Sequence, residues 1–274
     1  MTGPIQIGNL NVGRGFPLVI IAGPCVIEDQ DSPVRLASYL KKETEALGLG
    51  YIFKASYDKA NRTSIKSFRG PGLDEGLRIL ETVRRETGAL IMSDVHETAE
   101  VEAAAQVLDI IQIPAFLCRQ TRLLQTAART GRAINVKKGQ FLSPWDAAHV
   151  LEKVVAAGNE RVMITERGTS FGYNNLVVDM RSLAIMREFG RPVIFDATHS
   201  VQLPGGGGGC SGGDRAFIPP LARAATAVGV DGVFMEVHFN PDRALCDGPN
   251  SLPAEFFPSL IKSLAEIDRL IQPD

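Results

Sequence analysis

The sequence predicts an α/β protein built as a (β/α)8 TIM barrel, with a short β-hairpin before it at the N-terminus. Three observations predict this class. Short runs rich in Val, Ile and Phe recur along the 274 residues, an amphipathic stretch follows each run, and the alternation occurs eight times. Strands that alternate with helices indicate parallel β-α-β units, and eight units match a barrel in length. A doubly wound open sheet is the alternative that this alternation leaves open.

The eight apolar runs are the predicted barrel strands. They are nearly continuous in apolar residues, as in a sheet that helices cover on both faces. In chain order they are Pro17–Cys25, Tyr51–Lys59, Ala89–Glu97, Ile110–Ala115, Ala133–Gly139, Arg161–Gly168, Pro192–Ser200 and Gly232–Phe239.

The predicted helices follow these strands one by one, each with apolar residues at helical spacing. They are Ser32–Leu47, Leu73–Thr87, Ala99–Leu108, Gln120–Thr130, Pro144–Ala157, Val178–Phe189, Phe217–Val228 and Pro253–Ile271. Before the first strand, Ile5–Phe16 alternates apolar and polar residues around Gly8 and Gly13, which predicts a hairpin closing the lower end of the barrel. We find no linker or charge block, so residues 1–274 are expected to form one domain.

Composition and charge argue against several classes of protein. Lys and Arg number 29 and Asp and Glu 31, so the basic excess typical of nucleic-acid-binding proteins is missing. No apolar run approaches the roughly 20 residues of a membrane span, and no signal-peptide pattern precedes the first strand. The four cysteines are far apart and form no CxxC pair. We therefore expect a cytoplasmic protein with reduced thiols.

Polar side chains end nearly every apolar run. In a barrel, functional groups gather at the carboxyl ends of the strands, so these side chains are expected to meet at one mouth. The cations among them are Lys54, Lys59, Arg62, Lys137 and Arg167. Converging Lys and Arg suit phosphates and carboxylates, which predicts anionic substrates. Charges scattered over the surface are the alternative interpretation.

Two loops carry further signals. The segment Lys54–Gly72 combines charged, hydroxyl and amide groups, a mixture suited to binding a phosphate. The segment Pro204–Asp214 has seven glycines in eleven residues, and we interpret it as a flexible lid over the barrel mouth. A surface loop without such a role is the alternative. No GK[ST] motif is present, which argues against a Walker-type phosphate loop.

Four dispersed residues are candidate metal ligands. Cys25, His199 and Glu236 end the first, seventh and eighth predicted strands, and Asp247 follows in the next loop. These strands become neighbours when a barrel closes. A thiolate, an imidazole and two carboxylates suit Zn²⁺, Fe²⁺ or Mn²⁺. The spacing alone also fits a buried structural cysteine without a metal.

Long motifs in order carry a resemblance to one family. The sequence resembles the 3-deoxy-D-manno-octulosonate 8-phosphate (Kdo8P) synthases along nearly its whole length. The motifs are AGPC at 22–25, FKASYDKANRTS at 53–64, SFRGPG at 67–72, SDVHE at 93–97, DIIQIPAFLCRQT at 109–121, NVKKGQF at 135–141, ERGTSFGYNNLVVDMRS at 166–182, FDATHSVQ at 195–202 and MEVH…CDGP at 235–249.

The resemblance implies an activity and a map of the site. The family has a (β/α)8 barrel, usually forms homotetramers, and condenses phosphoenolpyruvate with D-arabinose 5-phosphate and water, releasing phosphate, in lipopolysaccharide biosynthesis. By motif, the phosphoenolpyruvate site would comprise Lys54, Ser56, Lys59, Gln112, Lys137 and Arg167. The sugar-phosphate site would comprise Asn61, Arg62, Thr63, Ser211 in the lid, and Arg119 reaching the sugar phosphate of a neighbouring subunit. Gln202 is also expected to bind substrate. The expected catalytic residues are Asp94, His96, Lys137, His199 and Asp247.

The family has a metal-dependent and a metal-independent branch. The first carries Cys at the position of Cys25 and the second carries Asn, so AGPC implies the metal-dependent branch. Cys25, His199, Glu236 and Asp247 would then bind a divalent ion of Zn, Fe, Mn or Co. Two places depart from the expected pattern. Thr63 stands where the family more often has Ser, and CDGPN at 246–250 is more similar to the metal-independent branch.

Two alternative functions remain at this point. A 3-deoxy-D-arabino-heptulosonate 7-phosphate synthase would use the same donor and metal set with erythrose 4-phosphate. That family would read KPRTS where this chain reads KANRTS at 59–64, so Asn61 favours the five-carbon sugar. A non-catalytic barrel that binds sugar phosphates would be expected to lack some of the reactive residues. In this chain all of the reactive positions carry the expected residues.

Overall fold

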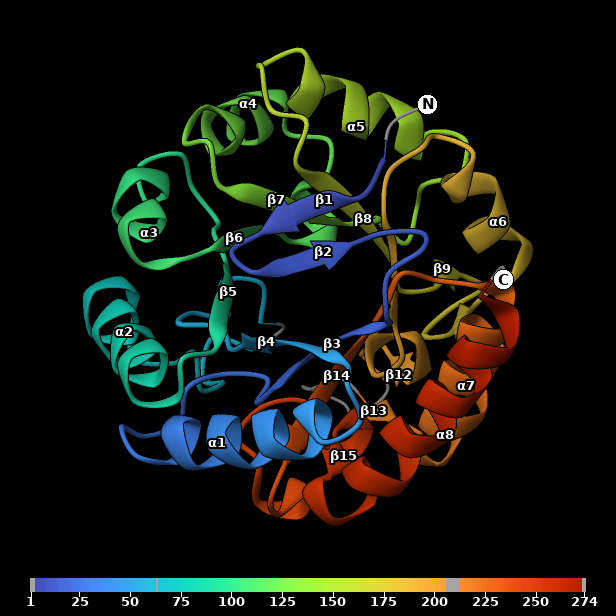
Figure 1. Cartoon of the computed structure of the whole chain (residues 1–274). Coiled ribbons are helices and arrows are strands. Elements are labelled where there is room, and N and C mark those ends of the chain that lie inside the picture. The colour runs from blue at the N-terminus through green and yellow to red at the C-terminus, as the bar shows by residue number, and fades with distance from the viewer. Residues whose placement is uncertain (1–2, 63, 206–211, 273–274) are drawn as a thin grey trace.

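The computed structural model describes residues 3–62, 64–205 and 212–272. Its centre is a closed barrel of eight parallel strands, seen in Figure 1 from the end that carries the hairpin. Closure follows from two pairings, β11 with β14 and β14 with β3. The predicted barrel is thereby confirmed, and the open doubly wound sheet is not formed. The strands are β3 (Val19–Gly23), β4 (Gly50–Lys54), β5 (Leu90–Asp94), β6 (Ile110–Ile113), β7 (Ala133–Lys137), β8 (Val162–Glu166), β11 (Val193–Asp196) and β14 (Gly232–His238).

Eight α-helices surround the strands, one after each barrel strand (Figure 1). All eight predicted helices are present, and most are shorter by a few residues because capping turns take up their ends. They are α1 (Ser32–Glu45), α2 (Leu73–Thr87), α3 (Val101–Val107), α4 (Thr121–Arg129), α5 (Ala147–Val155), α6 (Arg181–Arg187), α7 (Ile218–Val228) and α8 (Phe257–Ile271).

Local sequence explains several of these boundaries. Pro33, Pro219 and Pro258 lie in the first turns of α1, α7 and α8, where a missing N–H costs no helical hydrogen bond. Helix α2 ends at Gly88, whose φ of 65° is a left-handed conformation that glycine adopts without strain. The last residue of β3 is Gly23, where a Cβ would lie 2.1 Å from the Lys54 carbonyl oxygen, so the close approach of the two strands requires glycine.

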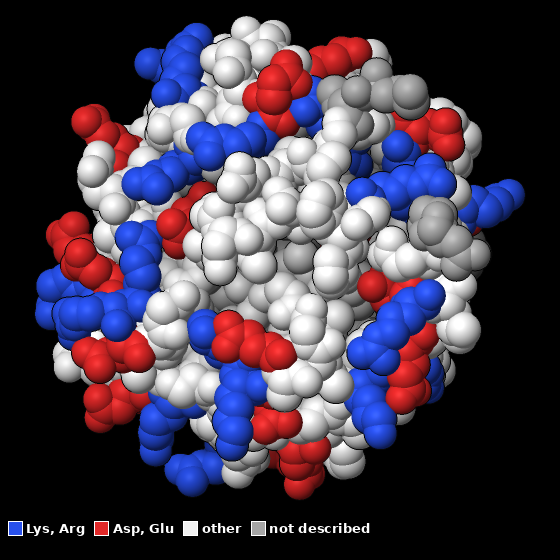
Figure 2. Space-filling model, viewed as in Figure 1, with Lys and Arg blue, Asp and Glu red and all other residues white. Residues whose placement is uncertain are grey.

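The N-terminal hairpin plugs one end of the barrel. Strands β1 (Ile5–Ile7) and β2 (Leu10–Val12) pair antiparallel and lie across the barrel end in Figure 1. Ile5, Ile7 and Val12 are buried in one cluster with inward-facing strand residues such as Ile21 and Phe234. In Figure 2 the centre of this face is free of charged side chains, and both signs mix around its rim. This end is therefore closed by apolar packing.

Additional short elements follow the barrel strands at the opposite end. The pair β9 (Thr169–Ser170) and β10 (Leu176–Val177) follows β8, the pair β12 (Gln202–Leu203) and β13 (Gly212–Gly213) follows β11, and β15 (Leu252–Pro253) follows β14. Turns of 3-10 helix lie in the loops after β6, β11 and β14: Ala115–Leu117, His199–Val201, Arg215–Phe217, Pro241–Arg243, Gly248–Asn250 and Ala254–Phe256. No helix in the described ranges is long and apolar enough to cross a membrane.

Candidate active site

A cavity of about 400 Å³ opens at the carboxyl ends of the barrel strands. All five cations that the sequence singled out line it: Lys54, Lys59, Arg62, Lys137 and Arg167. They come from β4 and the loop after it and from the ends of β7 and β8, and barrel closure brings these segments together. Four carboxylates line the same cavity, those of Asp94, Glu97, Asp196 and Asp247, so the five cations lie among anions and exceed them by one.

A larger hollow of about 790 Å³ lies at the opposite end, between the hairpin and the ends of α6, α7 and α8. Its Arg187 pairs with Asp231 at 3.8 Å, and the side chains of Asp231 and Asp268 accept hydrogen bonds from backbone N–H groups. These polar groups already have partners within the fold. The smaller cavity, where buried polar groups lack partners, is the better candidate for chemistry.

Arg167 is the clearest candidate for binding an anion. Its side chain is buried, and Nη2 donates to Gln202 Oε1 at 3.1 Å. Nη1 is also buried and has no hydrogen-bond partner. Burial lowers the pKa of Arg167 against the effect of several nearby carboxylates. A buried guanidinium N–H without an acceptor is costly, and a phosphate or carboxylate oxygen from a substrate would satisfy it.

Lys137 lies beside Arg167 in an unusual environment. Its Nζ donates to Asp196 and lies 3.3 Å from the centre of the Phe234 ring. Burial lowers its pKa to about 8, although Asp196 acts in the opposite direction. The nearby cations Lys54 and Arg167 contribute to this lowering. An arriving anion would therefore stabilise the charged form of Lys137.

Asp94 and His96 form a second polar cluster on the wall of the cavity. His96 Nε2 lies 3.0 Å from Asp94 Oδ2, and the other oxygen of Asp94 accepts from Ser56 Oγ at 2.5 Å and faces Lys54 Nζ at 3.1 Å. Burial alone would raise the pKa of Asp94, but Lys54 and His96 outweigh it and hold the pKa well below its usual range. Burial opposes the charged form of His96, yet Asp94 and Glu100 raise its pKa.

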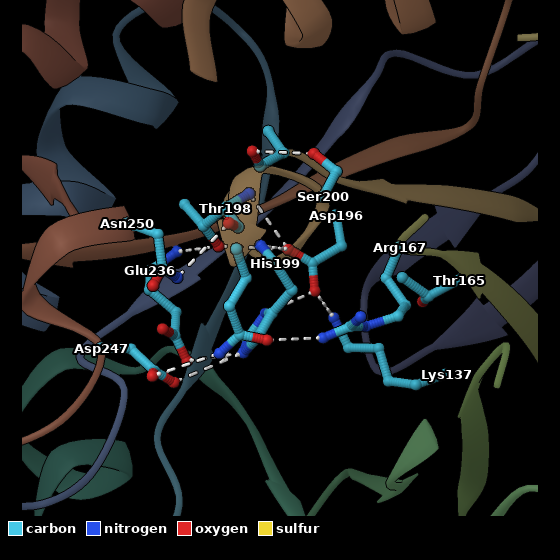
Figure 3. Close-up of polar contacts among 12 residues, drawn as sticks. Lys137, Thr165, Arg167, Asp196, Thr198, His199, Ser200, Glu236, Asp247 and Asn250 are labelled. Carbon is cyan, nitrogen blue, oxygen red and sulfur yellow. Dashed lines mark hydrogen bonds and ion pairs between the residues drawn. The ribbon is translucent and has the colours of Figure 1, made fainter. Parts of the chain in front are cut away.

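Asp196 is an organising residue that sequence reasoning did not include among the site residues. Its buried carboxylate accepts from His199 Nδ1 at 2.7 Å, from Lys137 Nζ, and from the backbone N–H of Thr198 at 3.1 Å. Figure 3 shows it between His199 and Lys137. Its position at the end of β11 was the only signal in the sequence. Glu100 was also not predicted as a site residue. It lies 3.6 Å from His96 Nδ1 and accepts a hydrogen bond from Tyr57 at 2.8 Å.

The candidate metal ligands lie around Asp247. His199 Nε2 is 3.4 Å from Glu236 Oε1 and 3.9 Å from Asp247 Oδ2, and these three side chains lie together on the left of Figure 3. Cys25 Sγ donates to Asp247 Oδ2 at 3.3 Å. Two groups of ligand atoms, each within 4.8 Å, share Asp247: His199, Glu236, Asp247 and Cys25, Cys246, Asp247.

Glu236 tests whether these residues fit a cation. Its side chain is fully buried, and neither carboxylate oxygen accepts a hydrogen bond. Lys59 Nζ is 3.7 Å away, too far for a hydrogen bond. A buried carboxylate without donors is costly unless a cation compensates it, so the donor set fits a divalent metal ion.

The remaining predicted residues are distributed as follows. Asn61 and Gln112 line the cavity, and Gln112 Oε1 accepts from Asn135 at 3.2 Å. Gln202 also lines it and bridges Arg167 to Asp247. Arg119 is exposed and does not line the cavity. Thr63 and Ser211 lie outside the described residues, as does 206–211 of the predicted lid, whose flanks β12 and β13 pair with each other.

Comparison with known proteins gives a consistent result. The model of the DAHP synthetase I family matches residues 4–272. A 2-dehydro-3-deoxyphosphooctonate aldolase of Geobacter metallireducens is 62% identical over 272 residues, which cover 99% of this chain and 100% of that relative. One of Desulfosudis oleivorans is 60% identical over 97% of this chain and 96% of its own length. One of Syntrophotalea carbinolica is 57% identical over 99% of this chain and 98% of its own length.

Proposed function

We propose, from the premise that this chain belongs to the DAHP synthetase I family, that it is a 2-dehydro-3-deoxyphosphooctonate aldolase, or Kdo8P synthase. It condenses phosphoenolpyruvate with D-arabinose 5-phosphate and water to give Kdo8P and phosphate, in lipopolysaccharide biosynthesis. The observation that carries this proposal is the cavity in which five cations meet and Arg167 keeps an unpartnered N–H, in a chain whose relatives bear that name.

The donor and acceptor sites divide the cavity between them. Lys137 and Arg167 bind the phosphate of phosphoenolpyruvate, and the neighbouring groups of Lys54, Ser56, Lys59 and Gln112 complete its site. Asn61 and Arg62 lie on the loop after β4 and bind arabinose 5-phosphate together with Thr63, Gln202 and Ser211. Arg119, which is exposed and does not line its own cavity, reaches the sugar phosphate bound by a neighbouring subunit in a homotetramer.

The reaction needs positive charge where phosphate leaves. C3 of phosphoenolpyruvate attacks the aldehyde of the open-chain sugar, water adds at C2, and the resulting hemiketal phosphate loses phosphate by cleavage of the C–O bond. Lys137 and Arg167 stabilise the negative charge that develops on the leaving phosphate, inside a cavity where water screens it little. Asp196 keeps Lys137 and His199 oriented by bonding both.

His96 and Asp94 are the groups that we expect to transfer protons. His96 is held between Asp94 and Glu100, whose charges raise its pKa, so it can donate a proton near neutral pH. Asp94 stays ionised beside Lys54 and Ser56. His96 is therefore the better placed of the two to protonate the alkoxide formed from the aldehyde.

A divalent metal ion of Zn, Fe, Mn or Co completes the site. Cys25, His199, Glu236 and Asp247 would hold it. When bound, such an ion supplies Lewis-acid polarisation of the aldehyde or activation of water. The protein orients the His199 ring, since Asp196 accepts a hydrogen bond from Nδ1 and leaves Nε2 facing Glu236.

The domain organisation and the cellular location of the chain belong to the same proposal. The whole chain acts as one barrel domain in the cytoplasm, where its free thiols Cys25, Cys118 and Cys246 stay reduced. No nucleic acid or membrane takes part in its reaction.

Phosphate release from phosphoenolpyruvate tests this function. Release is expected only when arabinose 5-phosphate is also present, to stop on full removal of metal by a chelator, and to return when divalent ion is added. Ligand binding with no release under any metal would instead support a non-catalytic sugar-phosphate-binding barrel. Full activity of metal-free protein would contradict the metal requirement while leaving the condensation itself intact.

A further inference from the structure

Cys246 is a feature that the proposed function does not yet explain. It lies in the loop after β14, directly before Asp247, and only 3% of its surface is exposed. Its Sγ, the Sγ of Cys25 and a carboxylate oxygen of Asp247 all lie within 4.8 Å of one another. The chain therefore places a second sulfur atom beside Cys25 and Asp247, two of the four residues proposed to bind metal.

Cys246 has both polar and apolar neighbours. Arg62 Nη1 donates to its Sγ at 2.7 Å. On the other side, Cys25 and Cys246 form a small buried cluster with Val26, against which Phe68 packs. Cys246 also lines the substrate cavity. Its sulfur atom is thus held between a cation, a second thiol and a carboxylate.

We propose that Cys246 is a second sulfur donor of the metal centre, alongside Cys25, His199, Glu236 and Asp247. The inference rests on the metal dependence proposed above. Two thiolates make the site softer than one thiolate would, so it selects thiophilic ions such as Zn²⁺, Co²⁺ and Cd²⁺ over Mn²⁺. Metal–sulfur bonds of about 2.3 Å in a five-coordinate site place two adjacent sulfur atoms about 3.3–4.0 Å apart. That spacing lies inside the limit observed for Cys25 and Cys246.

Local charge is compatible with two thiolates. Both thiolates together with Glu236 and Asp247 carry four negative charges. A divalent ion balances two of them. Lys59, at 3.7 Å from Glu236 and close to both thiols, and Arg62, bonded to Cys246, balance the other two. The second thiolate therefore leaves no uncompensated buried charge, which is the condition for an ionised group in a protein interior.

The sulfur count of the zinc-loaded wild-type enzyme tests the proposal without any variant. X-ray absorption fine structure at the zinc edge is expected to fit two sulfur donors. A fit with one sulfur donor overturns the proposal. Failure of the wild-type enzyme to bind zinc at all would overturn this inference and the proposed metal site together, whereas a one-sulfur site overturns this inference alone.

Cobalt-loaded variants give an independent readout. In Cys246→Ser, the thiolate-to-cobalt absorption in the near ultraviolet is expected to fall by about half, since one of two Co–S bonds is lost. Cys25→Ser should show a similar loss. Cys118→Ser is the matched control, because Cys118 is equally buried yet belongs to neither ligand group. An unchanged spectrum in Cys246→Ser would contradict the proposal.

Metal affinities complete the test. Cys246→Ser and Cys246→Ala are expected to weaken Cd²⁺ binding about 10- to 100-fold and Mn²⁺ binding by less than about threefold. Equal losses for the two ions would contradict a sulfur bond to the metal and point to a general disturbance of the loop. Thermal unfolding of both variants, compared with Cys118→Ser, identifies any such disturbance directly.

Discussion

Replacing Arg167 by methionine tests the proposed phosphate site most sharply. Methionine fills nearly the same volume but removes the guanidinium. The side chain of Arg167 is 5% exposed, and its buried Nη1 has no acceptor in the fold. The substitution therefore removes N–H donors that are proposed to bind the substrate. It breaks one side-chain hydrogen bond within the protein, the one to Gln202.

The expected loss follows from the bonds that a phosphate would make. A hydrogen bond to a charged group contributes about 1.5–3 kcal/mol, so two bonds from one guanidinium contribute about 3–6 kcal/mol. Since about 1.4 kcal/mol corresponds to tenfold, kcat/KM for phosphoenolpyruvate should fall about 10²- to 10⁴-fold. Arg167→Lys keeps the charge but loses the planar pair of donors, and a smaller loss of about 10- to 100-fold is expected.

The assay is steady-state consumption of phosphoenolpyruvate at saturating arabinose 5-phosphate. Arg181→Met is the matched control, because Arg181 is 86% exposed and pairs only with Asp179 next to it on the surface. That variant should keep wild-type kinetics. A kcat/KM for Arg167→Met within about threefold of wild type would refute the assignment of Arg167 to the donor phosphate.

Three further predictions follow from the same site. Lys137, with a pKa lowered to about 8, is charged below that pH and loses its proton above it, so kcat/KM for phosphoenolpyruvate in the free enzyme should decline as pH rises through about 8; a flat profile up to pH about 10 would argue against Lys137 as a phosphate ligand. Asp196→Asn removes the carboxylate that raises the pKa of Lys137, so this decline should begin at lower pH, and an unshifted pH profile would contradict the pairing. Gly23→Ala places a Cβ 2.1 Å from the Lys54 carbonyl oxygen and should cost about 1–3 kcal/mol in the free energy of unfolding, measured by urea denaturation, and an unchanged midpoint would show that the strands can separate there without strain.

The barrel could be predicted from the sequence because its signals are local. Each strand is an apolar run and each helix a 3.6-residue pattern, and both periodicities can be recognised within a dozen residues. The meeting of Lys54 with Lys137 and Arg167 was also predictable, since all parallel strands of a barrel end at one mouth. Barrel topology alone therefore located the cavity in which the five cations meet.

The side-chain pairings within the cavity could not be predicted from the sequence. Asp196 bonds Lys137 across 59 positions, and Arg62 bonds Cys246 across 184. Such contacts depend on the height of each side chain above the barrel and on its rotamer, which no local pattern encodes. The four predicted metal ligands lie around Asp247, and their division into two groups came only from the geometry. The role of Arg119 in a neighbouring subunit stays a prediction.

The choice of sugar is the most direct test of the proposed function. The family description names DAHP, whereas relatives 57–62% identical over nearly the whole chain are named as octonate aldolases. Phosphate release by the purified, metal-loaded enzyme should be measured with each sugar in turn at equal phosphoenolpyruvate. We predict a kcat/KM at least about 100-fold higher for arabinose 5-phosphate than for erythrose 4-phosphate. Faster release with erythrose 4-phosphate would contradict the proposed function and assign the chain to the heptulosonate-forming reaction.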